Sequence, residues 1–119
     1  MSKYVVTKVV VTRSTKGDPF KPDWPEMPGG GYKQYFKETY IDTGKMLSTS
    51  DSTSEDLLTL TSNSVWKSDE ERLKYMEDPI AKRFLEFLTD YRKSKNMTTE
   101  WVNKEYDGNT VIREWSGTW

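Results

Sequence analysis

Residues 4–13 read YVVTKVVVTR, and this stretch decides the fold. It is dense in β-branched residues, which favour the extended conformation, so it predicts a β-strand. Side chains alternate between the two faces of a strand. One face would carry Val5, Thr7, Val9 and Val11, and the other Tyr4, Val6, Lys8, Val10 and Thr12. Because both faces are mostly apolar, we expect a central strand that is covered on both sides.

The remaining elements are predicted from hydrophobic periodicity and turn residues. Tyr32, Tyr35, Phe36 and Tyr40 recur at helical spacing, and Gly44 stands where a glycine often ends a helix. Leu57 to Trp66 alternates as a strand does. We expect a helix at 32–43, a hairpin of strands at 45–50 and 57–66 around a polar turn at 51–56, and a second hairpin of strands at 97–106 and 109–115 around Asp107-Gly108.

A broken helix is predicted between the two hairpins. Ser68 and Glu71 form a capping-box pattern at its start, and Asp78-Pro79 interrupts the helix and begins a second piece. The second piece would bury Ile80, Phe84, Phe87, Leu88 and Tyr91. Arg92 is expected on the charged outer face, where a cation near the C-terminal end also suits the helix dipole.

The order of these elements is strand, helix, strand, strand, helix, strand, with one further strand at the end. This order predicts an α+β fold of the ferredoxin-like split βαβ type, with an antiparallel sheet and helices on one face. The extra C-terminal strand would extend the sheet as a hairpin. A length of 119 residues predicts one domain, residues 1–119, with a Pro-rich loop at 14–31.

The composition excludes several kinds of chemistry. The chain has no cysteine, so disulfides, thiolate nucleophiles and iron–sulfur clusters are excluded. It has no histidine, which excludes Ser-His-Asp catalysis and a histidine haem ligand. A net charge of −1 gives no long-range attraction to nucleic acid or to an anionic membrane. We expect no metal, no cofactor, no nucleic-acid partner and no membrane partner, and a cytoplasmic location.

One stretch carries a family resemblance. Residues 55–61 read EDLLTLT and lead through Val65-Trp66-Lys67-Ser68 to the capped helix with its Asp78-Pro79 break. Residues 57–88 in this respect resemble the dimeric α+β barrel superfamily, which includes the antibiotic-biosynthesis-monooxygenase-like domains. The resemblance implies a homodimer whose sheets face each other, and a cavity between sheet and helices. The long Pro-rich loop and the C-terminal hairpin depart from the pattern.

The resemblance also implies candidate site residues. Asn63 and Trp66 fall near the motif and are candidates for a catalytic role in cofactor-free oxygen chemistry. Tyr35, Tyr40 and Trp66 are candidates for binding a small aromatic ligand. Taken as structural residues instead, Trp66 would be part of the core and Asn63 would face solvent or an interface.

The Pro-rich loop is expected to be stiff. Its prolines at 19, 22, 25 and 28 are spaced by three, as in one turn of polyproline II. We expect Phe20, Trp24 and Met27 to pack on the body of the protein. The alternative is that its PxxP segments dock on another protein. The contacting residues would then be Pro19, Pro22, Trp24 and Pro25.

The sequence thus favours a non-catalytic, homodimeric accessory protein of phage or bacterial type that binds a small molecule or another protein. Two alternatives stay open: a cofactor-independent monooxygenase-like enzyme, and an interaction module that uses the PxxP loop.

Overall fold

The computed structural model describes residues 3–119, which form an α+β fold around one antiparallel sheet. The sheet has five strands in the order β2-β3-β1-β4-β5. The strands are β1 (Lys3–Thr12), β2 (Met46–Thr53), β3 (Thr59–Trp66), β4 (Thr98–Asp107) and β5 (Thr110–Thr118). The prediction that residues 4–13 form a central strand is confirmed, because β1 pairs with β3 on one side and β4 on the other.

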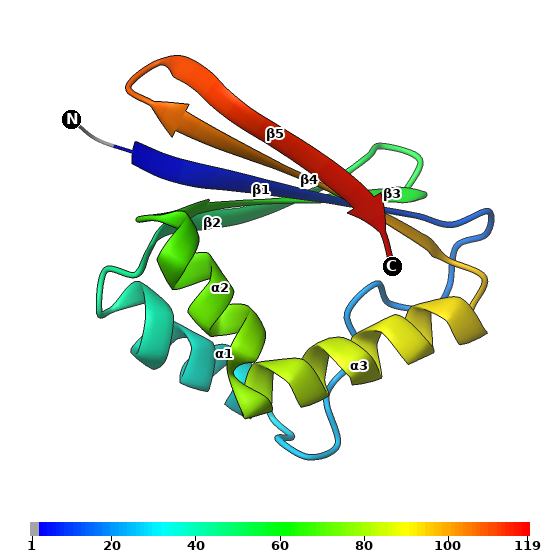
Figure 1. Ribbon diagram of the computed structural model, residues 1–119. Helices are drawn as coiled ribbons and strands as arrows, with labels where there is room; N and C mark the ends of the chain where they lie inside the picture. The colour runs from blue at the N-terminus through cyan, green and yellow to red at the C-terminus, as the bar shows by residue number, and fades with distance from the viewer. Residues whose placement is uncertain (1–2) are drawn as a thin grey trace.

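All helices lie against one face of the sheet (Figure 1). They are α1 (Gly31–Phe36), the π-helical segment η1 (Lys37–Ile41), α2 (Asp69–Glu77) and α3 (Pro79–Ser94). Along residues 3–119 no helix is both long enough and apolar enough to cross a bilayer.

Only one face of β1 is covered by this chain. Val5 and Val11 on the helix side are fully buried, whereas Val6 and Val10 on the opposite side are half-buried. The prediction of cover on both sides is therefore wrong for the single chain, since every helix packs on the same face. We call these two sides the inner face, toward the helices, and the outer face.

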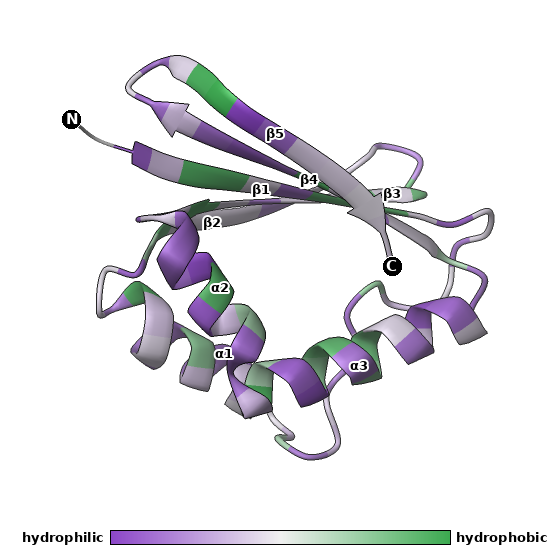
Figure 2. Cartoon of the chain, viewed as in Figure 1, coloured by the Kyte–Doolittle hydropathy of each residue, from purple (hydrophilic) through white to green (hydrophobic). Residues whose placement is uncertain are grey.

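The core is divided into two clusters at opposite ends of β1. One cluster joins Val5 to Tyr40, Met46 and Trp66, and the other joins Val11 to Leu60 and Met97. Figure 2 shows hydrophobic stretches in β1 and in parts of the helices. The middle of the inner face belongs to neither cluster, and this is where the candidate site lies.

Capping residues and the Asp78-Pro79 break in the sequence predict several helix boundaries correctly. Where the structure differs from the prediction, the difference has a physical cause. Ser68 accepts a hydrogen bond from the Glu71 N–H, and Asp78 caps α3 ahead of Pro79, as predicted. The expected helix at 32–43 begins as α1 but continues as a π-helix, in which the Asp42 N–H donates to the Lys37 carbonyl at 2.8 Å.

Both hairpin turns are displaced from their predicted positions. The polar segment that was expected to turn at 51–56 instead continues as a strand to Thr53, and the turn occupies residues 54–58, where Leu57 has a φ of 61°. The second turn is formed by Gly108 and Asn109 rather than by Asp107-Gly108, and β5 extends to Thr118.

Candidate functional site

A cavity of about 740 Å³ lies between the middle of the sheet and the helices. This volume is within the range of about 300–1,000 Å³ that is typical of small-molecule sites. β1 contributes Thr7 and Val9 to its wall, and α3 contributes Phe84 and Leu88. The cavity exists because the two core clusters hold the helices against the ends of β1 and leave the centre unfilled.

The floor of the cavity, formed by the inner face of the sheet, carries a group of polar side chains among apolar ones. Thr7, Ser62, Ser64 and Asn103 line it, and Thr7 lies between Val5 and Val9 on the inner face of β1. The Thr7 hydroxyl donates to Oδ1 of Asn103 at 2.5 Å, and Asn103 is only 3% exposed. No described residue accepts a hydrogen bond from the Asn103 amide N–H₂, so these donors are available to a molecule in the cavity.

The roof of the cavity is aromatic. Tyr32 of α1 stacks on Phe84 of α3 with ring centroids 3.8 Å apart, and Trp24 meets the Phe84 ring edge-on at 5.6 Å. All three residues line the cavity. Trp24 is 3% exposed, so the Pro-rich loop carries a buried side chain into the roof.

A tyrosine–aspartate cluster beside the cavity ties α1 and η1 to the junction of α2 and α3. Tyr35 and Tyr40 each donate a 2.5 Å hydrogen bond to Oδ2 of Asp78, while Oδ1 caps α3. Nearby, the hydroxyls of Tyr32 and Tyr75 lie 2.7 Å apart. These contacts fix the aromatic roof relative to α3.

The cluster shifts the pKa values of its members in opposite directions. Burial raises the pKa of Asp78, but the hydrogen bonds that it accepts from the two tyrosines and from backbone N–H groups outweigh burial, so the pKa is lowered. Burial raises the pKa of Tyr75 to about 12 and raises the pKa of Tyr40 further above its ordinary value. Asp78 is therefore a carboxylate at neutral pH, held by neutral tyrosines.

Arg92 of α3 lies at one end of the cavity. It is 4% exposed, and its Nε donates to the Phe20 carbonyl of the Pro-rich loop at 3.1 Å. The prediction that Arg92 lies on the outer face is wrong, because the loop folds back over this end of α3. Nearby, Asp51 pairs with Lys21 at 2.5 Å and accepts a 2.6 Å hydrogen bond from Ser62.

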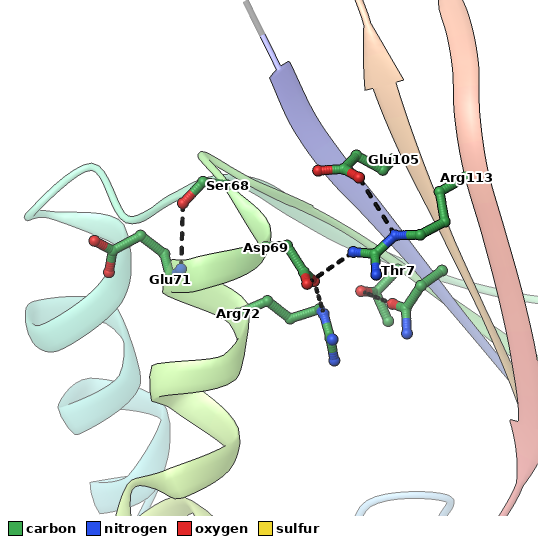
Figure 3. Close-up of polar contacts among 8 residues, drawn as sticks. Thr7, Ser68, Asp69, Glu71, Arg72, Glu105 and Arg113 are labelled. Carbon is green, nitrogen blue, oxygen red and sulfur yellow. Dashed lines mark hydrogen bonds and ion pairs between the residues drawn. The ribbon is translucent and has the colours of Figure 1, made fainter.

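An ionic network lies at the other end of the sheet, between α2 and the β4–β5 hairpin (Figure 3). Asp69 accepts from Arg72 at 2.7 Å and from Arg113 at 2.8 Å, and Arg113 also pairs with Glu105 at 3.3 Å. Both guanidinium groups stack over the ring of Trp115. Arg72 lines the cavity, so this network holds part of its wall.

The structure separates the candidate residues that were predicted from the family resemblance. Trp66 is 3% exposed and lines the cavity. Asn63 pairs with Lys8 on the outer face and does not line the cavity, because residues three apart on a strand point to opposite faces. Tyr35 and Tyr40 also lie outside the cavity wall and contact Asp78.

The candidate residues of the Pro-rich loop are also separated. Pro22 and Trp24 line the cavity, whereas Pro19 and Pro25 are exposed. Trp24 is buried within this chain, as expected if the loop packs on the body, and it offers little surface to another protein.

The sequence analysis did not identify Asn103 or Arg92 as residues of the cavity. Asn103 points to the same face of β4 as Thr99 and Trp101. A polar residue on the face of a strand that is expected to be buried could therefore have indicated a cavity residue. Arg92 follows Leu85 and Leu88 at spacings of seven and four, which places it on the apolar side of α3. The favourable effect of the helix dipole on a cation near the C-terminal end had suggested an exposed position for Arg92 instead.

The arrangement is suited to hold a flat molecule between an aromatic roof and a hydrogen-bonding floor. The two acidic side chains in its wall are already engaged: Asp23 accepts from the Gly29 N–H, and Asp51 from Lys21 and Ser62. No three acidic side chains within residues 3–119 are grouped in a way that would hold a metal ion. Comparison with protein-family models, with curated proteins and with solved structures finds no match for this chain.

Proposed function

We propose that this protein binds a small aromatic molecule in the cavity between its sheet and its helices. The observation that carries the proposal is the cavity itself, which combines an aromatic roof at Trp24, Tyr32 and Phe84 with a polar floor at Asn103. Apolar walls with a few convergent polar groups are typical of small-molecule sites.

Binding is favoured over catalysis by how the polar groups are used. Asp78 accepts hydrogen bonds from two tyrosines and the α3 backbone, and Asp51 is paired with Lys21. A general base needs a free lone pair within reach of substrate. The oxygenase alternative also loses its paired candidates, because Asn63 and Trp66 face opposite sides of the sheet.

The test is to fill the cavity from its floor. Ser64→Trp places an indole where a two-ring ligand would lie, whereas Ser14→Trp adds the same side chain at an exposed loop position outside the cavity wall. Isothermal titration with a panel of one- and two-ring aromatic compounds should find ligands for the wild-type protein. Ser64→Trp should abolish this binding and Ser14→Trp should preserve it. Equal binding by both variants would contradict the proposal.

We propose further that the fold is the ferredoxin-like split βαβ arrangement and that two copies associate through their sheets, as in dimeric α+β barrels. The strand connections support this arrangement, since helical segments join β1 to β2 and β3 to β4 while β1 lies antiparallel between β3 and β4. The outer face supports association. Its centre carries the half-buried Val6, Val10, Val65 and Val102, and all helices lie on the other face.

Light scattering after size-exclusion chromatography tests the association. A dimer should form and should dissociate when Val10 is replaced by Lys in the middle of the outer face. Leu73→Lys is the control, because Leu73 is 46% exposed on α2, away from that face. A wild-type monomer at high concentration would overturn the dimer but leave the cavity proposal intact.

A further inference from the structure

Arg92 is a buried cation without an ionic partner. The structure records one hydrogen bond from its guanidinium, which runs from Nε to the Phe20 carbonyl at 3.1 Å. Its two terminal nitrogens form no hydrogen bond or ion pair with any residue from 3 to 119, although the side chain is 96% removed from solvent and lines the cavity. Glu71 Oε2, and no Arg92 nitrogen, is the fully buried side-chain atom without a partner within residues 3–119, so the Arg92 terminal nitrogens are open to the cavity, where an anion would offset the cost of burying the charge.

The neighbouring acidic residue does not supply that anion. Asp51 is engaged by Lys21 at 2.5 Å and by Ser62 at 2.6 Å. Burial lowers the pKa of Arg92 to about 10, and Asp51 opposes this shift from a distance beyond ion-pair contact. Arg92 therefore remains a cation at neutral pH, and both terminal nitrogens keep their donors.

The cavity wall as a whole has an excess of positive charge. It contains four cationic side chains, Lys21, Lys33, Arg72 and Arg92, and two carboxylates, Asp23 and Asp51. Arg72 is neutralised by Asp69 and Lys21 by Asp51, so Arg92 is the buried cation that remains. A planar guanidinium fork matches a carboxylate, which it binds through two parallel hydrogen bonds.

We propose that the molecule bound in this cavity is an aromatic carboxylate, with its ring beneath Tyr32 and Phe84 and its carboxylate paired with the terminal nitrogens of Arg92. This inference rests on the proposed function and adds the chemical class of the ligand. The Asn103 amide would then contact a polar edge of the ring. The loop at Phe20 positions Arg92 and closes that end of the site.

Calorimetry with naphthalene-2-acetic acid and its neutral isostere, naphthalene-2-acetamide, separates the two proposals. The wild-type protein should bind the acid about tenfold or more tightly than the amide, because hydrogen bonds to charged groups are stronger than neutral ones. Arg92→Gln should remove this preference by weakening the binding of the acid much more than that of the amide. Lys93→Gln removes the same charge at the exposed neighbouring position and should preserve the preference.

Each other outcome has a defined meaning. Equal binding of acid and amide by the wild-type protein would overturn the carboxylate inference and leave the proposed function standing. Failure of both compounds, and of the wider aromatic panel, would overturn the proposed function as well. Decanoic acid is the third compound to be titrated. If this aliphatic acid binds more tightly than the aromatic acid, the inference that the ligand is aromatic is overturned. If Arg92→Gln does not fold, the wild-type comparison of acid with amide still decides.

Discussion

The hydroxyl of Tyr40 donates a 2.5 Å hydrogen bond to Oδ2 of Asp78, and this contact joins the π-helical segment to the N-cap residue of α3. The two residues are 38 positions apart in the chain. Tyr35 donates to the same oxygen from one turn earlier. Tyr35 lies in α1 and Tyr40 in η1, so the chain changes from α-helix to π-helix between the two tyrosines whose hydroxyls meet at one carboxylate.

Replacing Tyr40 by Phe should destabilise the protein by about 1.5–3 kcal/mol, the usual contribution of a hydrogen bond to a charged group. Tyr40 is 4% exposed, and its loss leaves Oδ2 of Asp78 with Tyr35 as its one remaining tyrosine donor. Chemical denaturation monitored by circular dichroism measures the change. Tyr4→Phe is the control, since the Tyr4 hydroxyl donates to the Gly108 carbonyl at an exposed position. Equal losses in the two variants would show that Asp78 does not depend on Tyr40.

Asp78 should also make stability depend on pH in the acid range. Burial raises its pKa, but hydrogen bonds from Tyr35 and Tyr40 outweigh burial and lower it below the unfolded value. A lowered folded-state pKa stabilises the protein fully above the unfolded value, about 3.9 for aspartate, and this stabilisation is lost as pH falls through the folded value. The stability difference between wild type and Asp78→Asn should therefore shrink below about pH 4.

Denaturation curves from pH 7 to pH 3 measure this difference. Asp90→Asn, on an exposed part of α3, is the control for removing a negative charge. If the difference between wild type and Asp78→Asn stays constant down to pH 3, the carboxylate at Asp78 does not contribute through its hydrogen bonds.

The fold was largely predictable because its signals are local. The β-branched run of β1, the Ser68 cap and the Asp78-Pro79 break each act within a few residues. The π-helix was not predicted from residues 32–43, and Tyr40 within it is held by a residue 38 positions away. Turn positions failed for a similar reason, since pairing with β3 extends β2 through a polar segment that would otherwise turn.

The sequence predicted where the candidate site lies but not which residues line it. Resemblance placed a cavity between sheet and helices, and Trp66 does line the cavity found there. Arg92 was misplaced because its burial depends on the Phe20 carbonyl, 72 residues earlier in the chain, and not on its own helix. A polar residue in a buried strand phase, such as Asn103, is a signal that sequence reasoning can use.

Gly117 of β5 should not tolerate a larger side chain. It pairs with Trp101 across the sheet, and a Cβ atom added to it would lie 2.6 Å from Cζ2 of the indole. Gly117→Ala should therefore displace the ring and cost about 1–3 kcal/mol, the usual range for overpacking. Because Trp101 lines the cavity, ligand affinity should change as well. Ser116→Ala, on the adjacent exposed position, is the control for both measurements.

A stable Gly117→Ala variant with unchanged tryptophan emission would contradict the close approach of β5 to the indole. A destabilised variant with unchanged ligand affinity would place the bound molecule away from Trp101.

Arg113→Ala should loosen the attachment of α2 to the sheet. Arg113 joins Asp69 of α2 to Glu105 of β4 and stacks over Trp115 at 4.0 Å. Its side chain is half exposed, so the expected loss is about 1 kcal/mol, which exposed ion pairs and cation–π contacts supply together. Hydrogen exchange should speed up in the first turn of α2, and Arg83→Ala, which removes one exposed pair with Glu26, should leave that turn unchanged. Unaltered exchange in Arg113→Ala would mean that Arg72 alone holds Asp69 in place.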